Sequence, residues 1–206
     1  PDNDGPLVLI RETSEEQYHG ATQIFVYTKD QPNLFGATVA VLDQLRLTIV
    51  DARIITSASN FSLDTYFVLE ENGEPIGDDP GRIAEIHDAL CNALKDSSRF
   101  PDIVQRRIPR QLKSFSVPTQ VNLTLDENHQ RNVLELITLD RPGLLARIGR
   151  IFMENGVLLQ NARIATLGER AEDIFFITDI DHKPFTDKEK CENLKLAICE
   201  QLDKVA

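Results

Sequence analysis

The spacing of hydrophobic residues along this chain changes between values typical of strands and values typical of helices. The same order of changes occurs twice. Runs rich in β-branched and aromatic residues predict short strands, and stretches in which apolar residues recur every three or four positions predict helices. In the first part of the chain, strand, strand, helix, strand, strand and helix are predicted at residues 7–10, 22–28, 34–45, 47–57, 63–69 and 80–94. In the second part, the same order follows at residues 117–125, 133–139, 144–155, 158–167, 174–179 and 186–205.

The repetition extends to individual residues. Residues 30–54 align with residues 140–164 at an offset of 110 positions, without a gap, and each segment starts with Asp-x-Pro. Further along, the stretch that begins at Asp64 matches the one that begins at Asp173 after a slip of one position. A period this long exceeds that of solenoid repeats, so it indicates two copies of one small domain.

Arg46 and Gly156 hold corresponding positions at the end of the first helix of each copy. Glycine adopts the left-handed conformation of a helix C-terminal cap at little cost. Arginine has a side chain that opposes this conformation. We therefore expect the helix before Arg46 to close differently from the helix before Gly156.

The order of elements predicts an α+β protein made of two ferredoxin-like domains. Each domain is expected to be a four-stranded antiparallel sheet with two helices on one face, circularly permuted to the order β-β-α-β-β-α. The alternative assigns the strand at 117–125 to the first copy, which leaves the second copy short of a strand and exposes a sheet edge. We expect the first domain at residues 6–98, a basic linker at 99–113 and the second domain at 114–206. The linker is either a solvated connector or a docking patch for an acidic surface.

Composition narrows the range of partners. The 206 residues carry a net charge of −11, which argues against nucleic acid and against an anionic membrane surface. No apolar run is long enough to span a bilayer, and the first residues show no signal-peptide pattern. Three cysteines without a paired spacing favour a reducing, cytoplasmic setting. The chain starts without a methionine, as expected from a cut inside a longer polypeptide or from processing.

The loop at residues 140–145 has the chemistry to hold a small zwitterion. It leads into a helix, and the N–H groups and dipole at a helix N-terminus attract a carboxylate. Gly143 lets a ligand approach the backbone, Pro142 starts the helix, and Asp140 could hold an ammonium group. The loop of the first copy carries Asn33 in place of the glycine. The alternative is that each Asp-x-Pro only caps a helix.

These motifs resemble the ACT domain, a small regulatory module that binds amino acids. The resemblance rests on D-x-P-G-L-L at 140–145, N-G-V after the helix and N-A-R-I in the next strand, and it covers both copies. Together with the basic linker and the stretch at 162–175, the pair of copies is similar to the C-terminal region of the bifunctional uridylyltransferase/uridylyl-removing enzymes of bacterial nitrogen regulation. In that family the resemblance implies a glutamine sensor that controls both activities toward the PII signalling protein.

The resemblance also implies the ligand-binding residues. In the second copy the candidates are Asp140, Arg141, Pro142, Gly143, Leu144, Leu145, Leu158 and Asn161. In the first copy they are Asp30, Pro32, Asn33, Leu34, Thr48 and Asp51. ACT ligands often lie between two domains, so pairing of the two copies within or between chains is expected.

No catalytic role is expected for this region. Phosphate-binding glycine motifs and paired nucleotidyltransferase aspartates are absent from the sequence, and we expect no cofactor and no metal site. His87-Asp88 is interpreted as a chance dipeptide on a helix. Two other functions remain open beside the regulatory region of a uridylyltransferase. One is a standalone tandem ACT amino-acid-binding regulator, and the other is an oligomerisation module without a ligand.

Overall fold

The computed structural model describes residues 5–13, 20–31, 33–57, 59–95, 117–167 and 169–203. The first half of the chain contains β1 (Leu7–Glu12), β2 (Thr22–Lys29), α1 (Leu34–Gln44), β3 (Thr48–Thr56), β4 (Phe61–Leu69) and α2 (Pro80–Leu94). The second half contains β5 (Gln120–Asp126), β6 (Arg131–Leu139), α3 (Leu144–Glu154), β7 (Val157–Arg163), β8 (Thr166–Leu167), β9 (Arg170–Asp179) and α4 (Lys188–Asp203). The predicted α+β class is therefore confirmed.

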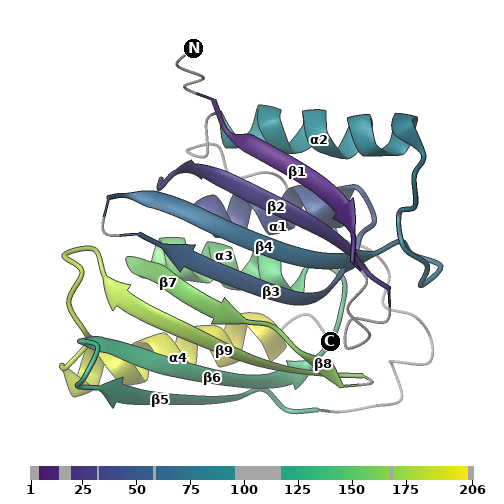
Figure 1. Ribbon diagram of the computed structural model, residues 1–206. Coiled ribbons are helices and arrows are strands. Elements are labelled where there is room, and N and C mark those ends of the chain that lie inside the picture. The colour runs from purple at the N-terminus through teal and green to yellow at the C-terminus, as the bar shows by residue number, and fades with distance from the viewer. Residues whose placement is uncertain are drawn as a thin grey trace.

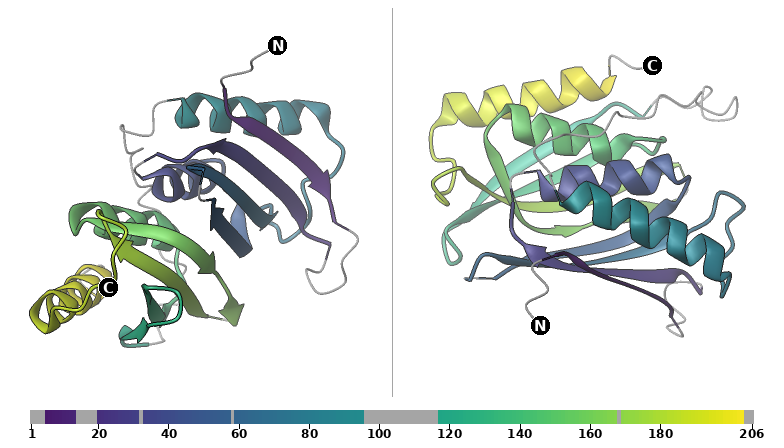
Figure 2. Two further views of the ribbon diagram at one scale, coloured as in Figure 1. Left: turned by 60° about the vertical axis from the view of Figure 1, so that its left-hand side comes forward. Right: turned by 90° about the horizontal axis from the view of Figure 1, so that it is seen from above.

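All strands belong to one antiparallel sheet (Figure 1), in the order β1-β2-β4-β3-β7-β9-β6-β5, with β8 attached to β9. In each half an N-terminal hairpin, β1–β2 or β5–β6, supplies the strand that completes a four-stranded sheet. Because β5 pairs with β6 of its own half, the circularly permuted order is confirmed and the alternative strand assignment is wrong. The four helices of the described residues lie side by side on one face of the sheet (Figure 2).

Several boundaries differ from the sequence prediction, and local hydrogen bonds account for three of them. The strand predicted to start at Val117 starts at Gln120, after Thr119 has bonded to Asp203 on α4. The strand predicted over 158–167 is interrupted, because Ala165 directs its N–H to the Asp173 side chain and β8 forms a separate short piece. The last helix begins at Lys188, since the Asp187 carboxylate accepts the first-turn N–H groups that follow it.

The core occupies the space between the sheet and the helices. Helix α1 is buried on nearly every side because α2 and α3 flank it and the sheet covers its base (Figure 2). Its sequence from Leu34 to Leu42 is accordingly apolar except for Thr38, whose hydroxyl group donates to the Leu34 carbonyl within the helix. Helices α2 and α4 lie at the ends of the row and each bury a single stripe, which includes Leu90 in α2 and Ile198 in α4.

The two halves meet at two places. The sheet is continuous because β3 pairs with β7 through Arg53 and Arg163, so the pairing of units lies within one chain. Behind the sheet, α1 and α3 approach so closely that a Cβ placed on Gly149 would lie 2.6 Å from the Cα of Gly36. Beside this contact, the Phe35 ring of the first half packs edge-on against Phe175 of the second half, with centroids 6.3 Å apart.

The ends of α1 and α3 correct one expectation from the sequence. Arg46 has φ = 63°, the same value as Gly156, so both helices close in the left-handed conformation. In both copies the N–H of this residue donates to the carbonyl three residues earlier. Arg46 thus adopts a backbone conformation that L-residues disfavour, because the turn into β3 requires it.

Some predicted features lie outside the described residues. The basic linker at 99–113 and the last residues of the C-terminal helix are among them. In the part of the chain that the structure describes, no helix is both long enough and apolar enough to cross a membrane.

The glycine contact between α1 and α3 leads to a stability prediction. Replacing Gly149 with Ala adds a methyl group against the backbone of Gly36, which cannot move away as a side chain would. We expect Gly149→Ala to lower the free energy of unfolding by about 1–3 kcal/mol, measured by urea denaturation. The control is Gly5→Ala, whose added Cβ meets no atom within 4 Å and should leave stability unchanged.

The conformation of Arg46 leads to a second stability prediction. We expect Arg46→Gly to be more stable than Arg46→Ala by about 1 kcal/mol, because only glycine relieves the left-handed strain. Both variants lose the exposed ion pair with Glu71, so the comparison isolates the backbone effect. Equal midpoints of thermal and urea unfolding for the two variants would show that Arg46 is not strained.

Candidate functional site

The loop-to-helix corners of the two halves have the same backbone geometry. Asn33 has φ = 66° and Gly143 has φ = 77°, and each occupies the N-cap of its helix without a side-chain capping bond. At the first corner the carbonyl of Asn33 accepts from Ala37, and at the second the carbonyl of Gly143 accepts from Arg147. Asn33 therefore reproduces the glycine conformation, as its short polar side chain allows.

A cleft of about 860 Å³ opens at the first corner, between the two halves of the chain. Its first-half wall consists of Asp30, Gln31, Asn33, Leu34, Phe35, Gly36, Ile54, Ile55, Thr56, Ser57, Asn60, Ser62 and Asp64. Its second-half wall consists of Arg131, Gly149, Phe152, Met153, Gly156, Val157, Leu158, Leu159, Gln160, Asn161, Ile180 and His182. The volume lies in the range of small-molecule sites, which are usually apolar clefts with a few convergent polar groups.

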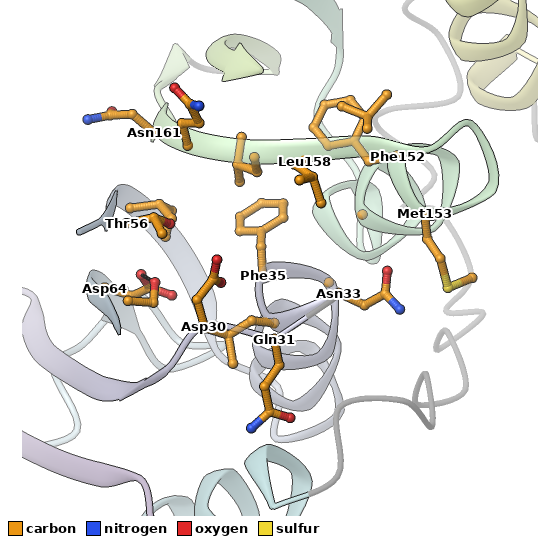
Figure 3. Close-up of a pocket in the computed structure, with 18 of the residues that line it drawn as sticks. Asp30, Gln31, Asn33, Phe35, Thr56, Asp64, Phe152, Met153, Leu158 and Asn161 are labelled. Atoms are coloured by element: carbon orange, nitrogen blue, oxygen red, sulfur yellow. Dashed lines mark hydrogen bonds between the residues drawn. The ribbon is translucent and has the colours of Figure 1, made fainter. Parts of the chain in front are cut away.

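Polar groups lie on both walls of the cleft (Figure 3). Asp30, Asp64 and Thr56 project from the first half, and the side chains of β7, including Leu158 and Asn161, face them from the second half. Phe35 stands between these walls. The cleft thus offers carboxylates beside an apolar surface and amides opposite them.

Burial raises the pKa of both carboxylates. The pKa of Asp30 is raised by burial, against the opposing effects of the Gln31 backbone N–H and the positive field of His182. The pKa of Asp64 is raised to about 7 by near-complete burial, although the side chains of Ser62 and Tyr66 stabilise its charge and Asp30 opposes it. Two neighbouring carboxylates that are largely removed from water favour a cationic partner.

Asp64 is held by hydroxyl groups from its own strand. The Ser62 hydroxyl donates to Oδ1 at 2.5 Å, and the Tyr66 hydroxyl lies 3.4 Å from Oδ2. The second half repeats the buried carboxylate at Asp173, whose pKa is also raised to about 7, first by burial and then by Asp140. The pair Asp30 and Asp64 is therefore a duplicated feature of the fold.

The cleft brings together five of the residues predicted from the sequence. Asp30, Asn33 and Leu34 lie on one wall, and Leu158 and Asn161 lie on the other. Pro32 lies outside the described residues. The remaining predicted residues do not line this cleft: Thr48, Asp51, Asp140, Arg141, Pro142, Gly143, Leu144 and Leu145. The cleft therefore combines the first corner with β7 of the second half. The second corner does not line it.

Sequence reasoning missed several residues that line the cleft. Phe35 is one, because helical spacing assigns it to the core of its own half, whereas its ring packs against Phe175. Asp64 is another, although a signal existed: an Asp occupies a buried-face position of the strand in both copies. Phe152 and His182 reach the cleft only because the halves associate.

Among the described residues, no group of three or more His, Cys, Asp or Glu side chains is placed to hold a metal ion.

The second half of the chain, which contains the second corner, matches a known sequence family. Residues 132–187 match the sequence family described as the ACT domain, and the first half repeats the same order of elements. The second half of the chain thus matches the ACT domain, as the sequence motifs predict.

The similarity to known proteins extends over almost the whole chain. It is 54% identical over 202 residues to the bifunctional uridylyltransferase/uridylyl-removing enzymes of Pseudomonas putida strain W619 and Azotobacter vinelandii strain DJ. The match covers 98% of this chain and 22% of each relative, so the chain spans about a fifth of their length. The resemblance stated from the sequence is confirmed.

Among solved structures, aspartate kinase from Synechocystis matches with a TM-score of 0.47 and 12% identity over 89% of this chain and 27% of that one. This likeness is too low to support a conclusion.

The raised pKa of Asp64 predicts a specific dependence of stability on pH. Because its pKa is about 7 in the folded state and near 3.8 when exposed, folding takes up a proton between these values. Stability from this group is present at low pH and falls as the pH rises toward 7, by at most about 4 kcal/mol. We expect Asp64→Asn to gain stability relative to the parent chain on going from pH 5 to pH 8.

Urea unfolding at the two pH values measures this difference. Asp88→Asn, at an exposed carboxylate on α2, is the matched control and should show no such gain. An equal effect of Asp64→Asn at pH 5 and pH 8 would mean that Asp64 is ionised throughout this range.

Proposed function

We propose that this chain is the glutamine-sensing region of a bifunctional uridylyltransferase/uridylyl-removing enzyme and that it controls both activities toward the PII protein. The observation that carries the proposal is the cleft between the Asn33 corner and β7. Its walls come from two ACT-type units, so a ligand within it would touch both. Similarity to the uridylyltransferase/uridylyl-removing enzymes supports the choice of parent enzyme. The cytoplasmic location expected from the sequence is part of the same proposal.

The cleft has a complementary group for each charged end of a free amino acid. Phe35 and Gly36 belong to the first turn of α1, where N–H groups have no acceptor within the helix and the dipole is positive. They would receive the ligand carboxylate. Asp30 would receive the ammonium group, since a cation relieves the cost of burying this carboxylate.

The ligand side chain would then extend toward the second half. Leu158 offers an apolar surface for the methylene groups, and Asn161 offers an amide that can both donate to and accept from a carboxamide. A glutamate side chain would instead bring a negative charge into a cleft that already holds Asp30 and Asp64. This arrangement favours the neutral amide of glutamine over its acid.

Control of the uridylyltransferase and uridylyl-removing activities would follow from the position of the cleft. A ligand that contacts α1 and β7 binds best to one arrangement of the two halves, and it shifts the population only by its differential affinity. Couplings of this kind are typically about 1–3 kcal/mol. The join between β3 and β7 is the element whose geometry such a ligand would bias.

Isothermal titration calorimetry of the 206-residue chain with glutamine tests this proposal, with the duplication as an internal control. We expect saturable binding, at least tenfold weaker for Asp30→Asn because the ammonium group loses its charged partner. Asp140→Asn makes the equivalent change at the second corner, outside the cleft, and should leave the affinity unchanged.

The two variants separate the alternatives. Loss of binding in Asp140→Asn, with binding retained in Asp30→Asn, would move the site to the second corner. A folded chain that gives no heat at millimolar glutamine would rule out glutamine sensing by this region and favour a module that only joins subunits.

A further inference from the structure

The second corner carries two arginines that the first corner lacks. Arg141 stands where the first half has Gln31, and Arg147 stands where it has Ala37. The surrounding backbone is the same, since the helix starts of both corners have matching hydrogen bonds. The fold therefore does not need these cations, and their presence calls for another explanation.

Both arginines have a buried, unsatisfied donor. Arg141 is only 8% exposed. The Nε atoms of Arg141 and Arg147 are both buried, and neither has a hydrogen-bond partner in the described part of the chain. A buried charged donor without an acceptor costs free energy, which an anionic acceptor would recover.

The charges around the pair leave it positive. Burial lowers the pKa of Arg141, repulsion by Arg147 lowers it further, and the Asp203 carboxylate only partly opposes them. Asp203 accepts hydrogen bonds from the backbone and hydroxyl group of Thr119, which already occupy one of its oxygens. The C-terminal end of α4 adds a partial negative charge near Asp203, whereas the N-terminus of α3 adds a positive one beside Arg141.

We propose that Arg141 and Arg147 form a binding site for a small oxyanion, a phosphate or carboxylate group, distinct from the cleft at the first corner. Neither arginine lines that cleft. Guanidinium groups bind both kinds of oxyanion through paired, charge-assisted hydrogen bonds. The two corners of one duplicated fold would then take different ligands: the first an amino acid between the halves, the second an anion within the second half.

Nuclear magnetic resonance of the 15N-labelled chain tests the site directly, because arginine Nε–Hε groups give separate signals. We expect the Arg141 and Arg147 signals, assigned from the single variants, to shift saturably with inorganic phosphate at constant ionic strength. Phosphate at about a hundred times its dissociation constant should also raise the melting temperature by about 5–10 °C. A parallel titration with succinate shows whether a carboxylate serves as well, and saturation by either probe supports the site.

A double variant that installs the residues of the first corner, Arg141→Gln with Arg147→Ala, gives the second test. It should lose the response to both probes and unfold at a higher temperature than the parent chain in probe-free buffer. The control Arg11→Gln with Lys190→Ala removes the same charge from exposed positions and should retain the response. Unmoved Nε–Hε signals, or a response that survives in the double variant, would overturn the proposal.

Discussion

The close approach of α1 to α3 at Gly36 and Gly149 is the constraint on which the rest of the structure depends. Only residues without a side chain allow the two helices to come this near. That distance lets β3 reach β7 and continue the sheet from one half to the other. It also brings the Phe35 ring of the first half into contact with Phe175 of the second half, and the cleft lies beside Phe35. The cleft and the continuous sheet thus depend on the same contact.

Duplication has preserved the backbone more strictly than the side chains. The left-handed N-cap is kept by Asn33 and Gly143, and the left-handed helix end is kept by Arg46 and Gly156. These positions are set by the turn into the next element, which does not change when the side chain does. Side chains that point away from the turns are free to diverge, so two corners of one geometry can present different chemistry. A tandem fold can in this way divide its functions.

Two buried carboxylates, Asp64 and Asp173, lower the stability of the fold when they are ionised. Asp64 and Asp173 occupy strand positions that the alternation of apolar residues would assign to the core, and burial raises the pKa of both to about 7. Their hydrogen bonds compensate only part of the desolvation. A buried ionisable group with a strongly shifted pKa beside a cleft is a common property of functional sites. Asp64 meets this description most fully, because it lines the cleft together with Asp30.

The sequence by itself determined the class, the duplication, the permuted order of elements and the corners that begin α1 and α3. These features follow from local periodicity and turn chemistry, which neighbouring residues encode. It did not determine the conformation of Arg46, because a turn can override the preference of one residue. Nor did it show that Phe35, Asp64 and Leu158 share a cleft, since these residues belong to separate elements. Only the tertiary structure decided which corner faces the other half, because that depends on how closely two helices can pack.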